Sequence, residues 1–234
     1  PTEVIALTFL LVVIYAVAGE RVGLFRLNLL FLPIILLITI VVTLLNLPLM
    51  EWGNYFPMFE TSITGYAKGT MTSIYSFTGF ERLLFYIALM KQPEKAPKYA
   101  CYGIIIVACT YLIVYIGAIG MFSSTAVQQI LFPSIEMARE IEVPGGFFER
   151  FESIYITIWV MTLFNVTALY YDAAVFALNS IFKKFTKVAV VFGLAPIIYV
   201  VSTLPQDYYA LTKMATYLGY TGAAGAFVIH LLSC

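Results

Sequence analysis

Long apolar runs separated by short polar turns occupy almost the whole sequence. A membrane-spanning α-helix needs about 20 consecutive, predominantly apolar residues. None of the runs alternates apolar and polar residues as the strands of a membrane barrel do, and lipid excludes open sheet edges. The pattern therefore predicts an all-α membrane protein with about seven transmembrane helices, at residues 4–19, 27–50, 70–90, 99–122, 153–182, 188–204 and 214–232.

Composition agrees with this prediction and narrows the classes of function. Hydrophobic residues make up 62% of the chain and charged residues 11%, against about 45–50% and about 25% in soluble domains. We therefore expect residues 1–234 to form a single transmembrane domain. The formal net charge is zero, which argues against nucleic acid as a partner. One histidine and no Cys/His spacing motif give no basis for a metal or another cofactor.

The first apolar run is short for a membrane span. Residues 4–19 would cover only about 24 Å as a helix, whereas the hydrocarbon core is about 30 Å thick. The run has no basic n-region and no cleavage-site pattern, so it is not a signal peptide. We expect it to be part of a longer helix, and the chain to be the C-terminal part of a larger protein.

Basic residues gather in the turns after the first, third and fifth predicted spans. These turns hold eight of the chain's 13 Lys and Arg residues, which are Arg21, Arg26, Lys91, Lys95, Lys98, Lys183, Lys184 and Lys187. Basic turns stay on the cytoplasmic side, so the C-terminus is predicted to be cytoplasmic and residues 123–149 to form an extracytoplasmic helical loop. Its helical spacing of apolar residues fits an external lid or docking surface, or a helical hairpin lying on the bundle.

The third predicted span carries unusual polar residues in its middle. Hydroxyl residues precede Gly79, and Glu81 and Arg82 follow closely. A charge near the centre of a spanning helix costs about 2.5–3.5 kcal/mol on insertion scales, so both side chains should face protein or water. A helix can unwind at such a glycine and free backbone groups for a ligand. We predict a break around residues 76–79 that faces the interior; the alternative is a small-residue packing stripe with a structural Glu81–Arg82 pair.

A second group of polar residues lies in the fifth predicted span. Asp172 lies about 16 Å from Lys183 along a helix, which predicts a position near the middle of the bilayer. Asn165 precedes it by two turns on a similar face and is a candidate ligand-binding residue. A carboxylate inside a membrane is a candidate for proton or ion coupling. The alternative is that Asp172 makes a buried hydrogen bond that fixes helix packing.

The residues around the predicted break resemble a known transporter element. The stretch Ser76-Phe77-Thr78-Gly79-Phe80-Glu81, followed by the basic turn 91–98, resembles the sixth helix and following turn of the amino acid–polyamine–organocation transporters. Two further stretches, at residues 132–141 and 148–154 with Trp159 following, make the chain similar to the endospore germination permease family. Members of that family are the B subunits of nutrient germinant receptors. Arg82 departs from the pattern of the wider transporter group.

The resemblance implies a fold and a binding site. Family members have ten helices in two inverted five-helix repeats, and the seven predicted spans resemble the fourth to the tenth, with the first three missing. Backbone carbonyls freed near residues 76–78 would accept hydrogen bonds from a ligand ammonium. The ligand-binding residues that the resemblance implies in this break are Ser76, Phe77, Thr78, Gly79, Phe80 and Glu81.

The resemblance also implies a function. The protein would lie in the inner membrane of bacterial spores, bind a small nutrient such as an amino acid, and start germination with an A subunit and a lipoprotein C subunit. Two other readings stay open, which are a proton-coupled amino acid transporter that uses Glu81 or Asp172, and an ion-conducting subunit of a larger complex. No nucleophile–base or metal constellation indicates an enzyme.

Overall fold

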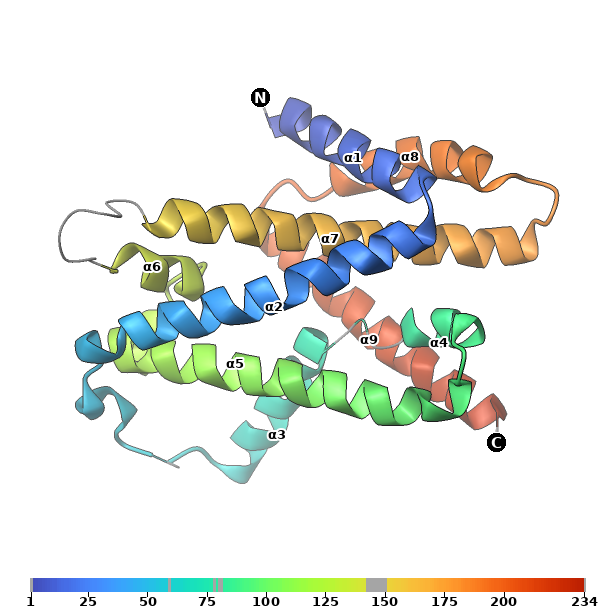
Figure 1. Ribbon diagram of the computed structural model, residues 1–234. Helices are drawn as coiled ribbons and strands as arrows, with labels where there is room; N and C mark the ends of the chain where they lie inside the picture. The colour runs from blue at the N-terminus through green and yellow to red at the C-terminus, as the bar shows by residue number, and fades with distance from the viewer. Residues whose placement is uncertain (1, 59, 78, 80–81, 142–150, 234) are drawn as a thin grey trace. The chain divides into compact units, whose positions relative to one another are not determined.

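Figure 1 presents a computed structural model of the chain, which describes residues 2–58, 60–77, 79, 82–141 and 151–233. Every regular element among these residues is helical. The α-helices are α1 (Thr2–Ala18), α2 (Arg21–Leu45), α3 (Ile63–Ser73), α4 (Arg82–Tyr86), α5 (Ala96–Val127), α6 (Pro133–Arg139), α7 (Phe151–Ile181), α8 (Lys187–Ser202) and α9 (Tyr208–Ser233). The 3-10 helices are η1 (Leu47–Leu49), η2 (Trp52–Tyr55), η3 (Ile74–Phe77), η4 (Ile87–Leu89) and η5 (Pro93–Lys95).

The helices agree with the prediction of an all-α membrane protein. Within the described residues, three helical stretches are long and apolar enough to cross a membrane, at Arg21–Leu49, Pro93–Val127 and Phe151–Ile181. Two apolar helices are shorter, at Glu3–Ala18 and Lys187–Ser202. All five coincide with predicted spans. The third predicted span is divided into shorter pieces, so the number of seven spans and the inverted repeat stay predictions.

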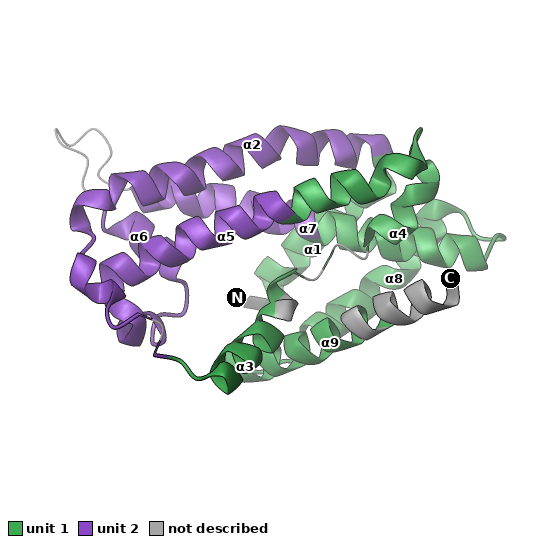
Figure 2. Cartoon of the chain, turned by 90° about the horizontal axis from the view of Figure 1, so that it is seen from below, with its two compact units in different colours: residues 1–21, 61–104, 167–234 green, residues 22–60, 105–166 purple. Residues whose placement is uncertain are grey.

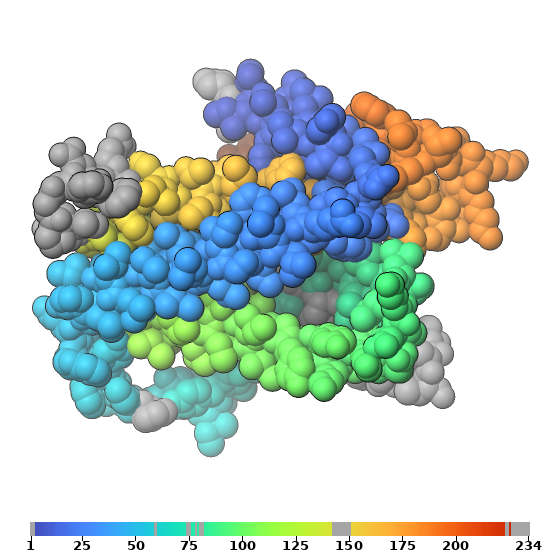
Figure 3. All heavy atoms as spheres, in the orientation of Figure 1, coloured from blue at the N-terminus to red at the C-terminus, as the bar shows by residue number. Residues whose placement is uncertain are grey.

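The surface of α2 has the character of a lipid-facing helix. This helix crosses the face seen in Figure 3 with its side chains uncovered along its length. Leu29, Leu30 and Leu37 are 72%, 61% and 63% exposed. Apolar surface of this extent is unfavourable in water and favourable against lipid tails. The exposure therefore fits a helix that has lipid as its solvent.

The chain packs as two compact units, coloured separately in Figure 2. The first unit contains residues 1–21, 61–104 and 167–234, and the second contains residues 22–60 and 105–166. Both α5 and α7 continue through the division. The units therefore share helices, and a single transmembrane domain over residues 1–234 stays a prediction.

In the first unit, α1 packs against α8. Val13 and Val17 of α1 are fully buried, as is Val191 of α8. Residues four apart lie on the same face of a helix, so the two α1 valines form one apolar contact strip. Thr186 caps α8, because its side-chain oxygen accepts a hydrogen bond from the Ala189 amide at 3.3 Å. The cap fixes the start of α8 and thereby the position of Lys187.

In the second unit, α6 is anchored to an apolar core. Met137 and Ala138 are 1% and 0% exposed and belong to a cluster that includes Val42 and Ala118. The Asn46 side-chain amide donates hydrogen bonds to the backbone oxygens of Met137 at 2.7 Å and Val42 at 2.9 Å. This burial favours the interpretation that the connection lies on the helices over that of a detached lid. Residues 142–149 of the predicted loop lie outside the described residues.

Candidate functional site

The third predicted span is broken where the sequence predicts a break. Helix α3 ends at Ser73, the 3-10 turn η3 follows, and α4 begins only at Arg82. Gly79 has a φ of 112°, a left-handed conformation that side chains other than hydrogen disfavour. The predicted discontinuity is therefore confirmed. The half-helix after the break is short, because α4 ends at Tyr86.

Hydroxyl residues weaken the helix before the break. The side chains of Thr70, Thr72 and Ser73 each donate a hydrogen bond to the carbonyl oxygen four residues earlier, at 3.0, 3.0 and 2.8 Å. Such bonds compete with the backbone ladder and destabilise or bend helices. Their concentration in the last turn of α3 gives a local reason for the change from α to 3-10 geometry.

The residues of the break differ in exposure. Ser76 is exposed, whereas Phe77 and Gly79 are partly buried. The predicted position of Ser76 facing the interior is therefore not confirmed in this chain. Thr78, Phe80 and Glu81 lie outside the described residues, so their ligand-binding roles stay predictions.

Arg82 folds back onto the break. Its Nε donates a hydrogen bond to the Gly79 carbonyl oxygen at 2.9 Å, and its guanidinium carbon lies 3.7 Å from the centre of the Tyr170 ring. A Cβ atom at Gly79 would collide with this guanidinium and would approach the Tyr170 hydroxyl closely. Glycine is thus required here both for its backbone angle and for the space that Arg82 occupies.

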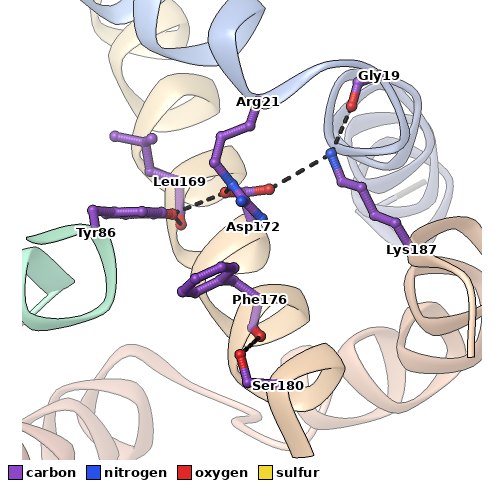
Figure 4. Close-up of polar contacts among 8 residues, drawn as sticks. All are labelled: Gly19, Arg21, Tyr86, Leu169, Asp172, Phe176, Ser180 and Lys187. Atoms are coloured by element: carbon purple, nitrogen blue, oxygen red, sulfur yellow. Dashed lines mark hydrogen bonds and ion pairs between the residues drawn. The ribbon is translucent and has the colours of Figure 1, made fainter. Parts of the chain in front are cut away.

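Asp172 is the centre of a buried charge cluster, drawn in Figure 4. Its side chain is 0% exposed, and its Oδ2 accepts a hydrogen bond from Arg21 Nε at 2.5 Å. Lys187 Nζ lies 3.7 Å from Oδ1 and donates to the Gly19 carbonyl oxygen at 2.6 Å. Two cations therefore face one carboxylate. Burial lowers the pKa of Lys187, which precedes the predicted span 188–204, and the Asp172 carboxylate opposes this shift.

Aromatic residues complete the Asp172 cluster. The Tyr86 hydroxyl lies 3.1 Å from Asp172 Oδ2 and 3.2 Å from the Leu169 carbonyl oxygen. The Phe176 ring stacks on Tyr86, with ring centres 6.3 Å apart, and the Arg21 guanidinium lies 4.5 Å from its centre. The carboxylate is held by residues from α2, α4 and α8, so the cluster joins these helices to α7.

The depth of Asp172 in the bilayer stays a prediction. Arg21 and Lys187 are the first residues of α2 and α8, so the carboxylate lies level with two helix starts. The prediction of a position near the middle of the bilayer rests on the number of helical residues between Asp172 and the basic residue Lys183. Helix α7 continues beyond Asp172 to Ile181, about 14 Å farther. Asp172 therefore lies beside the first residues of two helices, while its own helix continues past it in both directions.

Asn165 has a different environment from Asp172. It is 3% exposed, and neither atom of its side-chain amide has a hydrogen-bond partner in the described part of the chain. Leaving a buried polar group without a partner costs about 1–3 kcal/mol. Such a group is a candidate for contact with a ligand or water. Its predicted place in a ligand site stays a prediction.

Comparison with known proteins decides the family. The model that describes spore germination proteins matches residues 1–209. The chain is a member of the spore germination protein family.

Relatives in this family are similar over most of the chain. Spore germination protein GerLB of Bacillus cereus is 40% identical over 222 residues, which are 94% of this chain and 59% of that protein. Spore germination protein YndE of Bacillus subtilis (strain 168) is 32% identical over 207 residues, 88% of this chain and 57% of that protein. Spore germination protein A2 of the same strain is 28% identical over 221 residues, 94% of this chain and 60% of that protein.

The match does not extend over the full length of these family members. The chain spans about three fifths of the curated relatives it matches. No solved structure matches the chain. The family is therefore established by sequence, and the functional geometry rests on the contacts described above.

Sequence reasoning identified Asp172 in this family member but missed its partners. Arg21 is 151 positions from Asp172 in the sequence, and Tyr86 is 86 positions away. Arg21 and Lys187 were assigned to cytoplasmic turns by their charge alone. The sequence does contain one indication of such partners. A carboxylate buried in an apolar helix requires a cation, and that cation has to come from another segment.

Proposed function

We propose that the chain is the C-terminal part of a nutrient-sensing B subunit of a spore germinant receptor. The observation that carries this proposal is membership of the spore germination protein family, with 40% identity to a Bacillus cereus member over 94% of the chain. Because the chain spans about three fifths of its relatives, the activity belongs to the longer protein. The fold of that protein would be the ten-helix inverted repeat, in which these helices are the fourth to the tenth.

The ligand in this proposal is an amino acid or a similar small nutrient. It would contact the break at residues 76–81, where Ser76, Phe77 and Gly79 belong to the described part, and the Asn165 amide. Two observations support this assignment. The interruption between α3 and α4 takes backbone groups out of a continuous helical ladder. The Asn165 side chain is buried, and neither of its polar atoms has a partner within the described ranges.

The partners and location in this proposal follow from the same family. The subunit would cross the inner membrane of the spore several times, with a cytoplasmic C-terminus. It would act together with an A subunit and a lipoprotein C subunit. Residues 123–149 would form the extracytoplasmic loop, with α6 seated on the helices of its unit.

Accessibility measurements test this orientation. In the full-length protein with native cysteines replaced, Lys95→Cys and Lys184→Cys should react with an impermeant maleimide only from the cytoplasmic side. Glu140→Cys should react only from outside. The reason is the excess of Lys and Arg in the turns that contain Lys95 and Lys184. Labelling of Glu140→Cys from the cytoplasm alone would refute both the orientation and the alignment to the last seven helices.

A proton-coupled amino acid transporter is the second candidate. The observation in its favour is Asp172, a fully buried carboxylate with two cations and a tyrosine hydroxyl as neighbours. Carboxylates inside membranes serve as proton relays in transporters. In this candidate Asp172 would be the coupling group, and protonation would release Arg21 or Lys187.

Ligand binding and uptake separate the two candidates. The full-length protein would be reconstituted in proteoliposomes, and binding and uptake of radiolabelled amino acids would be measured with and without a proton gradient. Binding without concentrative uptake supports the sensor. Uptake that follows the gradient and is lost in Asp172→Asn supports the transporter. In parallel, spores that lack the gene should lose a nutrient response, and the intact gene should restore it; an unchanged response would refute the sensing role.

A further inference from the structure

Arg82 keeps unused hydrogen-bonding capacity beside the break. A guanidinium carries five N–H donors in one plane. Nε donates to the Gly79 carbonyl oxygen, and the plane lies against the Tyr170 ring. Nη1 is buried and has no hydrogen-bond acceptor among the described residues. No ion pair joins Arg82 to a carboxylate within the described part of the chain. The cation is therefore held in place while its Nη1 stays unpaired among these residues.

An unpaired guanidinium edge in this environment is unfavourable. Burial of a charged donor without an acceptor costs more than burial of a neutral one, and charged residues inside membrane segments are expected to pair or to face a polar pathway. The contact with Tyr170 compensates part of this cost through the ring face. It leaves the in-plane Nη1 hydrogens without an acceptor. An acceptor oxygen that reached Nη1 would remove this cost, and an oxyanion would also compensate the positive charge.

The packing around Arg82 keeps this edge in a fixed position. The hydrogen bond from Nε to Gly79 and the Tyr170 ring determine the plane of the guanidinium. Gly79 has no side chain, and a Cβ there would displace the guanidinium. A positioned planar fork suits a carboxylate, whose two oxygens can accept from it side by side. Lysine would supply the charge without this geometry.

We propose that Arg82 Nη1 binds an oxyanion, and that in the proposed nutrient sensor this anion is the carboxylate of the nutrient. The inference rests on the proposed function and deepens it, because it restricts the ligand to molecules with a free carboxylate. The phosphate of an anionic lipid offers the same chemistry. The experiment below therefore includes a lipid arm.

The test compares carboxylates with their amides. Full-length protein would be purified in a phosphate-free, non-ionic detergent, and binding of each of the twenty L-amino acids and its carboxamide would be measured calorimetrically. We expect at least one amino acid to bind about tenfold to hundredfold more tightly than its carboxamide, the range for one hydrogen bond to a charged group. Arg82→Gln should abolish this preference and Arg82→Lys should restore part of it. The exposed Arg26 provides a matched control, and Arg26→Gln should leave the preference unchanged.

Each contrary result has a defined meaning. Equal binding of amino acid and carboxamide by the unmodified protein overturns the inference, even if Arg82→Gln does not fold. So does a preference that survives in Arg82→Gln. If phosphatidylglycerol, and no amino acid, raises the melting temperature in an Arg82-dependent way, the nutrient carboxylate is refuted in favour of a lipid phosphate. A spore response only to nutrients that lack a carboxylate also refutes it, while the sensing function stands. If deletion of the gene changes no nutrient response, the sensing function is refuted instead.

Discussion

Asp172 and Asn165 lie about two turns apart on α7 and are both buried, yet their hydrogen-bonding environments are opposite. The Asp172 carboxylate has Arg21, Lys187 and Tyr86 as neighbours, contributed by three other helices. The Asn165 amide has no hydrogen-bond partner among the residues that the structure describes. The chain therefore provides hydrogen bonds for Asp172 Oδ2 and a nearby cation, without a hydrogen bond, for Oδ1. It provides neither for the neutral amide.

The difference separates two uses of a buried polar group. A carboxylate with partners from several helices fixes the packing of those helices, because breaking a buried pair leaves an uncompensated charge. An amide without partners contributes nothing to packing and costs free energy until another molecule contacts it. Stability measurements on the two residues should therefore move in opposite directions.

Removal of the Asp172 carboxylate should have the largest effect. Asp172→Leu leaves Arg21 and Lys187 without their anion, and we expect a loss of about 3–5 kcal/mol in the free energy of unfolding. The measurement is thermal unfolding of the full-length protein in detergent, together with its abundance in membranes. Asp207→Asn is the control, since that exposed side chain caps α9 through Ala210 and asparagine caps equally well. A loss below about 1 kcal/mol would show that Asp172, like Asn165, does not stabilise the packing of the helices.

Gly79→Val should affect function more than stability. The left-handed φ and the contacts with Arg82 and Tyr170 impose strain of roughly 1–3 kcal/mol on a β-branched residue. We expect a marked decrease in the nutrient response of spores at nearly normal protein abundance. Gly103→Val is the matched control, because nothing lies within 4 Å of its added Cβ. Equal losses of response in the two variants would remove the break from the candidate site.

Asn165→Leu tests whether the buried amide without a hydrogen-bond partner contributes to stability. Replacing an unpaired buried amide by an apolar side chain of similar size should leave the free energy of unfolding unchanged or raise it by about 1–2 kcal/mol. The nutrient response should nevertheless decrease. Asn46→Leu is the informative contrast, because that amide holds Met137 and Val42 and its loss should lower the melting temperature. Destabilisation by Asn165→Leu would indicate that Asn165 has a packing role after all.

Lys187→Met should have the smallest effect. Arg21 still neutralises Asp172, and Lys187 lies 3.7 Å from the carboxylate without a hydrogen bond to it. We expect a loss of about 0.2–1 kcal/mol, measured against Lys184→Met on the exposed turn. A loss as large as that of Asp172→Leu would show that Lys187, and not Arg21, is the principal partner.

The sequence predicted features that depend on neighbouring residues. The apolar runs predict the positions of the long helices, and Gly79 after a series of hydroxyl residues predicts the position of the break. Both features depend on residues that are close together in the sequence. Asp172 and Asn165 were identified as unusual because polar residues are costly in apolar helices.

Features that depend on distant segments were not predictable in this way. Nothing near Asp172 indicates that Arg21, 151 positions away, donates to it. The exposure of Ser76 also depends on which helices pack beside the break. The depth of Asp172 stays a prediction, because it depends on where the membrane surface crosses α7.

The Asp172 cluster also constrains how the protein can be assembled during synthesis. Helix α7 presents a carboxylate to the insertion machinery, at a cost of about 2.5–3.5 kcal/mol when such a group reaches the helix centre. Arg21 is made 151 residues earlier, so its cation is already present when Asp172 emerges, whereas Lys187 follows 15 residues later. Translation order thus supplies a counter-ion before the carboxylate has to enter lipid.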